Sequence, residues 1–212
     1  MRERASKEVR TGRPVGEPVC AGGEKQKKSG ARRHRLFDRI PCLEDDRIML
    51  RRLEPADAND LRELAHDKRV YRYLPTFLFE QKNEDPIEVI ERLYSDCFRA
   101  KESLILGIFL KENGMFCGLA EFYGYKEALH KTCVGYRLME RCWGRGIATG
   151  TVALMVDYLF GRTDIEIITA STMVENRASA RVLEKNGFIM TAAGVPEDWG
   201  YPESPPADKW FR

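Results

Sequence analysis

Apolar and polar residues alternate with two different periods along this chain, and the changes of period outline the expected elements. Residues 47–53 are typical of a first strand, and Pro55 beside acidic residues marks the start of a helix, because proline and carboxylates both suit a first helical turn. A second helix is expected from Pro86, after which apolar residues recur at helical spacing as far as Cys97.

The rest of the chain alternates strands with helices. The expected elements are strands at 104–110, 115–123 and 132–139, a helix at 147–160, a strand at 165–169, a helix at 176–186 and a strand that starts at 188–191, followed by a loop as far as residue 209. Asn113-Gly114 separates the first two of these strands and is a strong hairpin signal. This order predicts an α/β domain with a central mixed sheet.

The composition of the chain indicates the cellular compartment to expect. Of the 212 residues 43% are hydrophobic, which suits a folded domain with a core. No apolar run reaches the roughly 20 residues of a membrane helix, and the N-terminus lacks the apolar stretch of a secretory signal. We therefore expect a cytoplasmic protein. The six cysteines include no C-x-x-C pair, so no structural metal site is expected.

Charge is distributed unevenly between the leading segment and the rest. Residues 1–40 hold 12 Lys and Arg against five Asp and Glu, a net charge of +7, whereas the remaining 172 residues hold 23 against 28, a net charge of −5. We expect residues 1–41 to be a disordered basic extension and residues 42–212 to be the folded domain. A passive extension and an arm that contacts nucleic acid or the ribosome both remain open, because binding of a basic tail to polyanions is non-specific.

The strongest chemical signal is the segment Met139–Thr149, in which a strand ends, two glycines follow and a helix begins. Glycine leaves backbone N–H groups uncovered, and the first N–H groups of a helix have no partners within the helix. Such a turn suits a pyrophosphate. Arg141 and Arg145 would add positive charge at its rim. The spacing is not that of a P-loop or of a dinucleotide-binding fingerprint.

This segment resembles the pyrophosphate loop of GNAT acetyltransferases, Q/R-x-x-G-x-G/A, with Trp143 at the first position, Gly146 at the central glycine and Ala148 at the last position. Trp at the first position is typical of the branch that includes ribosomal-protein N-terminal acetyltransferases. A second segment, Asn176–Phe188, resembles that branch's N-x-x-S-x-x-V-x-x-x-x-G-F motif. The resemblance extends from about residue 45 to residue 212.

The resemblance implies the GNAT fold, in which two neighbouring strands of a splayed sheet part and acetyl-CoA lies in the gap. Backbone groups near Leu138 and Met139 would hold the pantetheine, and the side chain of Asn176 would bond it. The pyrophosphate would be held by the loop residues Gly144, Arg145, Gly146, Ile147, Ala148 and Thr149. Residues 68–82, which we call the acceptor wall, would flank the acceptor. We expect Trp143 to be a core anchor.

The implied reaction is the direct attack of a neutral amine on the thioester, assisted by a base. Many relatives place a tyrosine acid seven residues after the asparagine, a position that Leu183 occupies here. Ser179 is the nearest alternative, as a hydrogen-bond donor to the leaving sulfur. For the base we choose Glu121 on the expected strand 115–123, with Asp198 as second choice.

The sequence therefore predicts an acetyl-CoA-dependent N-acetyltransferase that acts on a primary amine, either a protein N-terminus or a small molecule, as a monomer or homodimer. Because the tyrosine acid is absent, the alternative is an acyl-CoA-binding or regulatory protein without catalysis.

Overall fold

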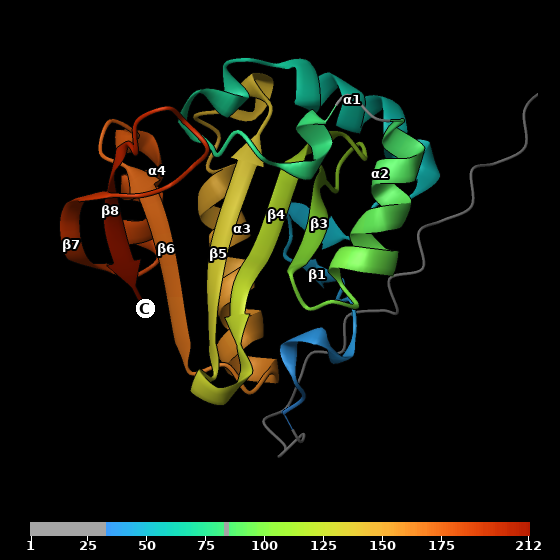
Figure 1. The fold of residues 1–212 in the computed structure, drawn as a ribbon. Coiled ribbons are helices and arrows are strands. Elements are labelled where there is room, and N and C mark those ends of the chain that lie inside the picture. Colours follow the sequence, from blue (N-terminus) through green and yellow to red (C-terminus); the bar gives the residue numbers. More distant parts are fainter. Residues whose placement is uncertain (1–32, 83–84) are drawn as a thin grey trace, which may run out of the picture.

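The computed structural model describes residues 33–82 and 85–212, which fold around one central sheet (Figure 1). Its strands are β1 (Leu43–Glu44), β2 (Ile48–Arg51), β3 (Ser103–Leu110), β4 (Phe116–Lys126), β5 (Lys131–Leu138), β6 (Ile167–Met173), β7 (Ile189–Pro196) and β8 (Pro206–Phe211). The α-helices are α1 (Ala58–His66), α2 (Pro86–Arg92), α3 (Ile147–Arg162) and α4 (Arg177–Lys185). The expected α/β class with a mixed sheet is confirmed.

The strands lie in the order β1-β2-β3-β4-β5-β6-β8-β7, and only the pair β5–β6 is parallel. In Figure 1 the helices α1 and α2 lie at one side of the sheet, while α3 runs behind β4 and β5. β3 is buried along its whole length, because both of its faces are covered. The hairpin expected at Asn113-Gly114 joins β3 to β4, and Gly114 has the positive φ of +70° that this turn requires.

The sheet splits in the middle. β5 and β6 pair only where Lys131–Cys133 meet Ile167–Thr169, and no ladder joins β6 to the second half of β5. The splayed sheet that the resemblance implies is therefore confirmed. Beyond the split, β8 pairs with both β6 and β7 and closes the sheet.

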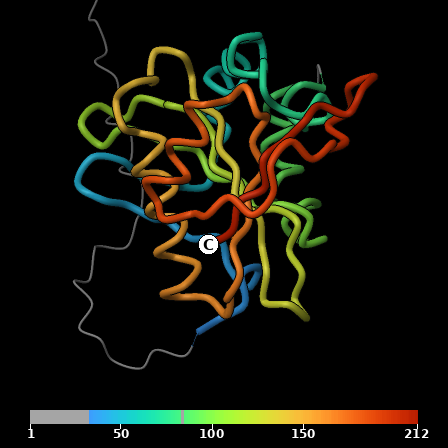
Figure 2. The backbone as a smooth tube through the Cα atoms, turned by 90° about the vertical axis from the view of Figure 1, so that its left-hand side faces the viewer, coloured from blue at the N-terminus to red at the C-terminus, as the bar shows by residue number. Residues whose placement is uncertain are grey.

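The end of the chain differs from the sequence-based prediction. The expected loop before residue 209 contains most of β7 and the first half of β8. Every residue of β7 is exposed, so neither face of the strand needs apolar residues. Its sequence therefore lacks the alternation of apolar and polar residues by which a strand is recognised. The loop between these strands projects toward the acceptor wall, as both views show (Figures 1 and 2). The N–H of Thr76 donates to the Trp199 carbonyl at 2.8 Å, which joins the two segments.

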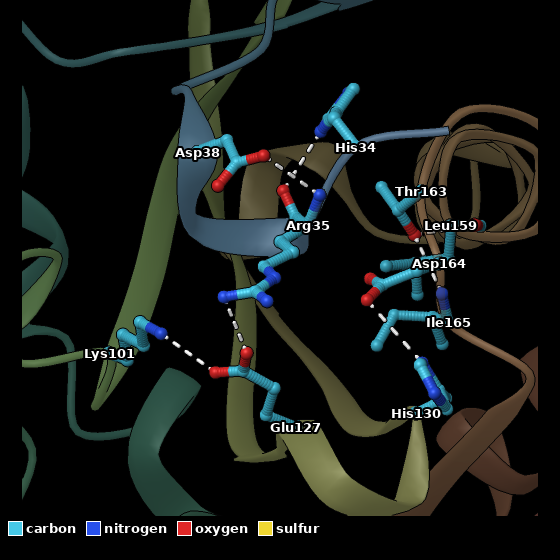
Figure 3. A network of polar contacts seen from close by, with 10 residues as sticks. All are labelled: His34, Arg35, Asp38, Lys101, Glu127, His130, Leu159, Thr163, Asp164 and Ile165. Atoms are coloured by element: carbon cyan, nitrogen blue, oxygen red, sulfur yellow. Dashed lines mark hydrogen bonds and ion pairs between the residues drawn. The ribbon is translucent and has the colours of Figure 1, made fainter. Parts of the chain in front are cut away.

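The folded part begins earlier than residue 42. Leu36 is fully buried, and the Phe37 ring packs against Phe98 and Tyr125 at centroid distances of 5.5 and 5.2 Å. Arg35 forms an ion pair of 2.7 Å with Glu127, in a group of polar contacts at the edge of the domain (Figure 3).

Backbone bonds attach the same segment to the end of α3. The His34 N–H donates to the Arg162 carbonyl at 3.2 Å, and the Asp164 N–H donates to the His34 carbonyl at 3.0 Å. The described part of the expected extension, residues 33–41, therefore packs on the domain, and residues 1–32 lie outside the described residues. Among the helices of the described residues, none is long and apolar enough to cross a membrane.

Candidate functional site

A cavity of about 760 Å³ lies where β5 and β6 part. Its lining includes nine of the residues singled out from the sequence, namely Glu121, Leu138, Gly144, Gly146, Ile147, Ala148, Thr149, Asn176 and Ser179. The acceptor wall and Asp198 line the same cavity. Segments that are more than 100 residues apart in the chain thus meet at one site.

Backbone groups of β5 face the gap. The Met139 N–H donates to the Cys117 carbonyl at 2.8 Å, so the odd-numbered residues of β5 direct their backbone groups toward β4. Tyr136 and Leu138 consequently direct theirs toward β6, at the part of β5 that β6 does not pair. This is an open strand edge, to which an extended amide-containing chain can add as a further strand.

Trp143 covers one end of that edge. The residue is 47% exposed, so the expectation of a core anchor is wrong. The indole N–H donates to the Leu138 carbonyl at 2.8 Å, which draws the ring over the rim of the cavity instead of into the core. The Leu138 N–H faces the same gap. A ligand amide or thioester carbonyl is therefore best met by this donor.

The glycine loop ends at the N-terminus of α3. Gly144 and Gly146 have φ values of +69° and +76°, in the left-handed region that glycine adopts without strain. Gly146 caps α3, so the N–H groups of the first helical turn point into the cavity without partners in the helix. Arg47 fixes the loop from behind by donating to the Arg145 carbonyl at 3.0 Å. Such a set of backbone donors suits an anion.

Three other residues from the sequence analysis lie outside this lining. Met139 is only 2% exposed and belongs to the core. Arg145 directs its side chain toward Glu112, at 4.0 Å, and Arg141 pairs with Glu63 at 2.5 Å. The two arginine side chains are thus turned to the outer surface, and the loop reaches the cavity through its backbone.

Asn176 and Ser179 sit at the start of α4, on the opposite side of the gap. The Asn176 carboxamide oxygen accepts from the Ser179 N–H at 3.1 Å and caps the helix, which leaves its NH₂ group as the donor for a ligand. The Tyr136 hydroxyl donates to Ser179 Oγ at 3.3 Å. Burial raises the pKa of Tyr136, and the bond to Ser179 offsets part of this rise, so the phenol stays protonated and acts as a donor.

Glu121 is held firmly beside the cavity. Its carboxylate accepts from Ser103 Oγ at 2.6 Å and from Arg137 Nη1 at 2.8 Å, and its side chain is 15% exposed. Each carboxylate oxygen has a second lone pair, which can accept from a water or an amine. Asp198 is exposed, and its carboxylate accepts from the Gly200 N–H at 2.9 Å.

Sequence reasoning missed Arg137 and Glu80, and treated Tyr136 as a half-buried strand aromatic. Arg137 is a charged residue in the otherwise apolar second half of its strand, and such a position is a signal of a paired charge. Glu80 carries no such signal, because it lies in an irregular segment far from β5 in the chain. Only the tertiary structure brings its carboxylate to Arg137.

Comparisons with known proteins agree with this geometry. A family model for the GNAT acetyltransferase domain matches residues 47–189. YjcK of Bacillus subtilis, named a probable N-acetyltransferase, is 31% identical over 154 residues, which cover 69% of this chain and 82% of that protein. YoaA of Bacillus subtilis, named an uncharacterized N-acetyltransferase, is 26% identical over 169 residues, which cover 80% of this chain and 93% of that protein.

Solved structures share the fold. RimL, a ribosomal L7/L12 alpha-N-protein acetyltransferase in complex with coenzyme A, superposes with a TM-score of 0.69 at 16% identity, over 81% of this chain and 97% of that one. Spermidine N-acetyltransferase of Vibrio cholerae, in complex with CoA and spermine, gives 0.66 at 18% identity, over 79% and 96%. Together with the splayed sheet and the glycine loop, the family match establishes that this chain belongs to the GNAT acetyltransferase family.

Proposed function

We propose that the protein transfers the acetyl group of acetyl-CoA to a primary amine within a ternary complex. The observation that carries this proposal is the single cavity in which an open strand edge, a backbone anion site and the acceptor wall meet. An open edge suits the amides of pantetheine, and the start of α3 suits the pyrophosphate. Because acetyl-CoA is made and kept inside cells, we also propose a cytoplasmic location.

The proposed binding residues divide the cofactor between them. The Leu138 backbone meets the pantetheine and polarises the thioester carbonyl, and Asn176 donates its NH₂ group to the pantetheine. The backbone from Gly144 to Thr149 surrounds the pyrophosphate, with Arg145 contributing main-chain atoms only. Met139, which is buried, supports this strand end through its bond to Cys117.

In the reaction, the acceptor gives a proton to Glu121, directly or through a water, and its nitrogen attacks the carbonyl carbon. A C–N bond forms and the C–S bond breaks. The thiolate of coenzyme A leaves and takes up the proton that the attacking nitrogen loses when the tetrahedral intermediate collapses to the amide. Ser179 donates a hydrogen bond to the sulfur, and the hydroxyl of Tyr136 on β5 donates to Ser179. These two hydroxyl groups lie near Leu183, which stands where many relatives have a tyrosine acid.

The acceptor is either a protein N-terminus or a small-molecule amine. Among the structural neighbours, RimL is named for an N-terminal substrate, and the spermidine acetyltransferase was solved with spermine. The cavity is bordered by aromatic residues of the wall, and Phe77 is 56% exposed at its mouth.

The test is turnover of acetyl-CoA, followed by release of coenzyme A, over a panel of peptides with free N-termini, polyamines and amino acids. We expect Glu121→Gln to lower kcat by about 10²–10⁴-fold, the range for loss of a general base, with little change in acetyl-CoA affinity. Asp198→Asn is the matched control on the second carboxylate.

The outcomes separate the two candidate functions. Turnover of one acceptor class that depends on Glu121 supports the transferase. Binding of acetyl-CoA without turnover of any amine would instead support a non-catalytic acyl-CoA-binding protein. A Glu121→Gln variant that keeps full turnover between pH 6 and 9 would remove Glu121 from the reaction.

A further inference from the structure

Arg137 carries a deeply buried charge at the cavity. Its side chain is 3% exposed, and it lies between two carboxylates from different parts of the chain. Glu121 on β4 accepts from Nη1 at 2.8 Å, and Glu80, in the short turn Phe79–Gln81 of the acceptor wall, forms an ion pair with Nε. Although burial alone would lower the pKa of Arg137, the two carboxylates outweigh this and raise it.

The ion cluster has a hydroxyl group at each end. The Tyr71 hydroxyl donates to the Glu80 carboxylate at 3.0 Å, and the Ser103 hydroxyl donates to the Glu121 carboxylate at 2.6 Å. Burial and the charge of Glu80 raise the pKa of Tyr71, so this phenol keeps its proton and remains a donor. The wall is thereby connected to β3, β4 and β5 through one continuous set of polar contacts.

The members of the cluster differ in their place relative to the cavity. Arg137 and Glu121 line it, whereas Glu80 belongs to the wall but is not part of the lining, and 2% of its side chain is exposed. Arg137 also directly precedes Leu138, whose N–H faces the gap. The Arg137 guanidinium therefore contacts both the proposed base, Glu121, and the acceptor wall, through Glu80. The residue itself lies on the strand that is proposed to bind the cofactor.

The charges of the cluster do not balance. Two carboxylates face one guanidinium, and an unpaired charge away from water is costly. An ammonium group that enters the cavity beside Glu121 would supply the missing positive charge. Apolar residues of similar volume often stabilise a protein as well as a buried ion pair does, so the presence of this cluster is weak evidence for a role in stability.

We propose that Arg137 is a positioning residue for acetyl transfer, which orients Glu121 and, through Glu80, the acceptor wall, so that the acceptor is received as an ammonium ion. This inference rests on the proposed function. Arg137 acts through its two carboxylate partners and does not touch the reacting atoms. Its loss is expected to affect the acceptor and the chemical step, and to leave the pyrophosphate site at α3 unaffected.

The test compares four variants in the full chain, with unfolding temperature, acetyl-CoA affinity, kcat and acceptor KM measured for each. In Arg137→Met we expect kcat to fall by about 10²-fold, because an error of about 1 Å in the placement of a reacting group costs that much. Arg137→Lys restores the positive charge but lacks the planar guanidinium that can bond two carboxylates at once. We therefore expect the unfolding temperature to return closer to its wild-type value than kcat does.

Glu80→Gln tests the wall separately. It leaves a one-to-one pair of Arg137 and Glu121, and we expect a several-fold higher acceptor KM with a smaller change in kcat. Arg51→Met is the control for loss of a partly buried ion pair away from the cavity, since Arg51 bonds both carboxylate oxygens of Asp57, at 2.8 and 3.0 Å. This control is expected to lose stability and keep the kcat of the folded protein.

Several results would overturn the inference. A folded Arg137→Met variant with wild-type kcat and KM would do so, as would an equal loss of kcat in Arg51→Met. If Arg137→Met does not fold, the Glu80→Gln variant becomes the test, and an unchanged acceptor KM in that variant contradicts the inference. A wild-type protein that turns over no amine overturns the proposed function and this inference together, whereas normal turnover in the variants overturns only the inference.

Discussion

Gly146 offers the sharpest test of the anion site, because its substitution can be separated into backbone and charge effects. A Cβ at this position would meet only Arg47 Nη1, at 3.8 Å, so space is available. The φ of +76° would nevertheless strain any other residue, by roughly 1–2 kcal/mol. That strain is present with and without ligand. Gly146→Ala is therefore expected to lower the unfolding temperature and to change acetyl-CoA affinity little.

Gly146→Glu adds a carboxylate at the mouth of the anion site. Two unit charges 5–6 Å apart repel by about 3 kcal/mol at an effective dielectric constant of 20. This corresponds to a loss of affinity of about 10²-fold for each charge of the pyrophosphate that the carboxylate approaches. The difference in affinity between the Glu and Ala variants isolates this term, since both carry the same backbone strain.

Calorimetric titration of acetyl-CoA into the wild type and both variants measures the three affinities, with circular dichroism to verify folding. At 1 M salt the Debye length is about 3 Å, so we expect Gly146→Glu to regain part of its lost acetyl-CoA affinity. Equal affinities in folded Glu and Ala variants would refute the assignment of the loop. A folded wild type that does not bind acetyl-CoA would refute the proposed function itself.

Three further predictions concern other parts of the molecule. Tyr136→Phe removes only the hydroxyl that donates to Ser179. We expect kcat to fall by roughly 2–10-fold, which corresponds to the loss of one hydrogen bond. If the two hydroxyls act as one unit, kcat should fall no further in the double variant with Ser179→Ala. Leu36→Ala is expected to cost about 2–5 kcal/mol in urea unfolding, whereas a dispensable extension would tolerate it. Burial and the neighbouring Cys142 thiol raise the pKa of Cys117 to about 12, and burial raises that of Tyr94 to about 12. The unfolded chain ionises first as pH rises, so the free energy of unfolding should fall above about pH 8.5, and Cys117→Ala should reduce this slope.

Local pattern was enough for the features whose cause is local. The Asn113-Gly114 hairpin, the glycine turn into α3 and the N-terminus of α4 at Asn176 each depend on a few adjacent residues. Helix α3 extends from Ile147 to Arg162, against an expected 147–160. The motifs around Gly146 and Asn176 were also sufficient to indicate the family, which the family model confirms.

Contacts between distant segments decided what the sequence pattern left open. Residues 33–41 were expected to belong to a basic extension, yet Leu36 is fully buried and Phe37 packs against Phe98, more than 60 residues away. Trp143 was expected in the core, but its indole N–H is satisfied by the Leu138 carbonyl at the rim of the cavity. In both cases the burial of a side chain depends on partners that no local period encodes.

The sequence by itself determined the α/β class, the order of most elements and the position of the glycine loop before α3, because hydrophobic period, glycine and helix termini act over a few residues. The tertiary structure decided which charges meet. Arg137 and Glu80 are 57 positions apart in the chain, and their ion pair exists only because the acceptor wall packs against β5. Electrostatic interactions between buried groups depend on distance in space and on the removal of water, and both are properties of the folded chain.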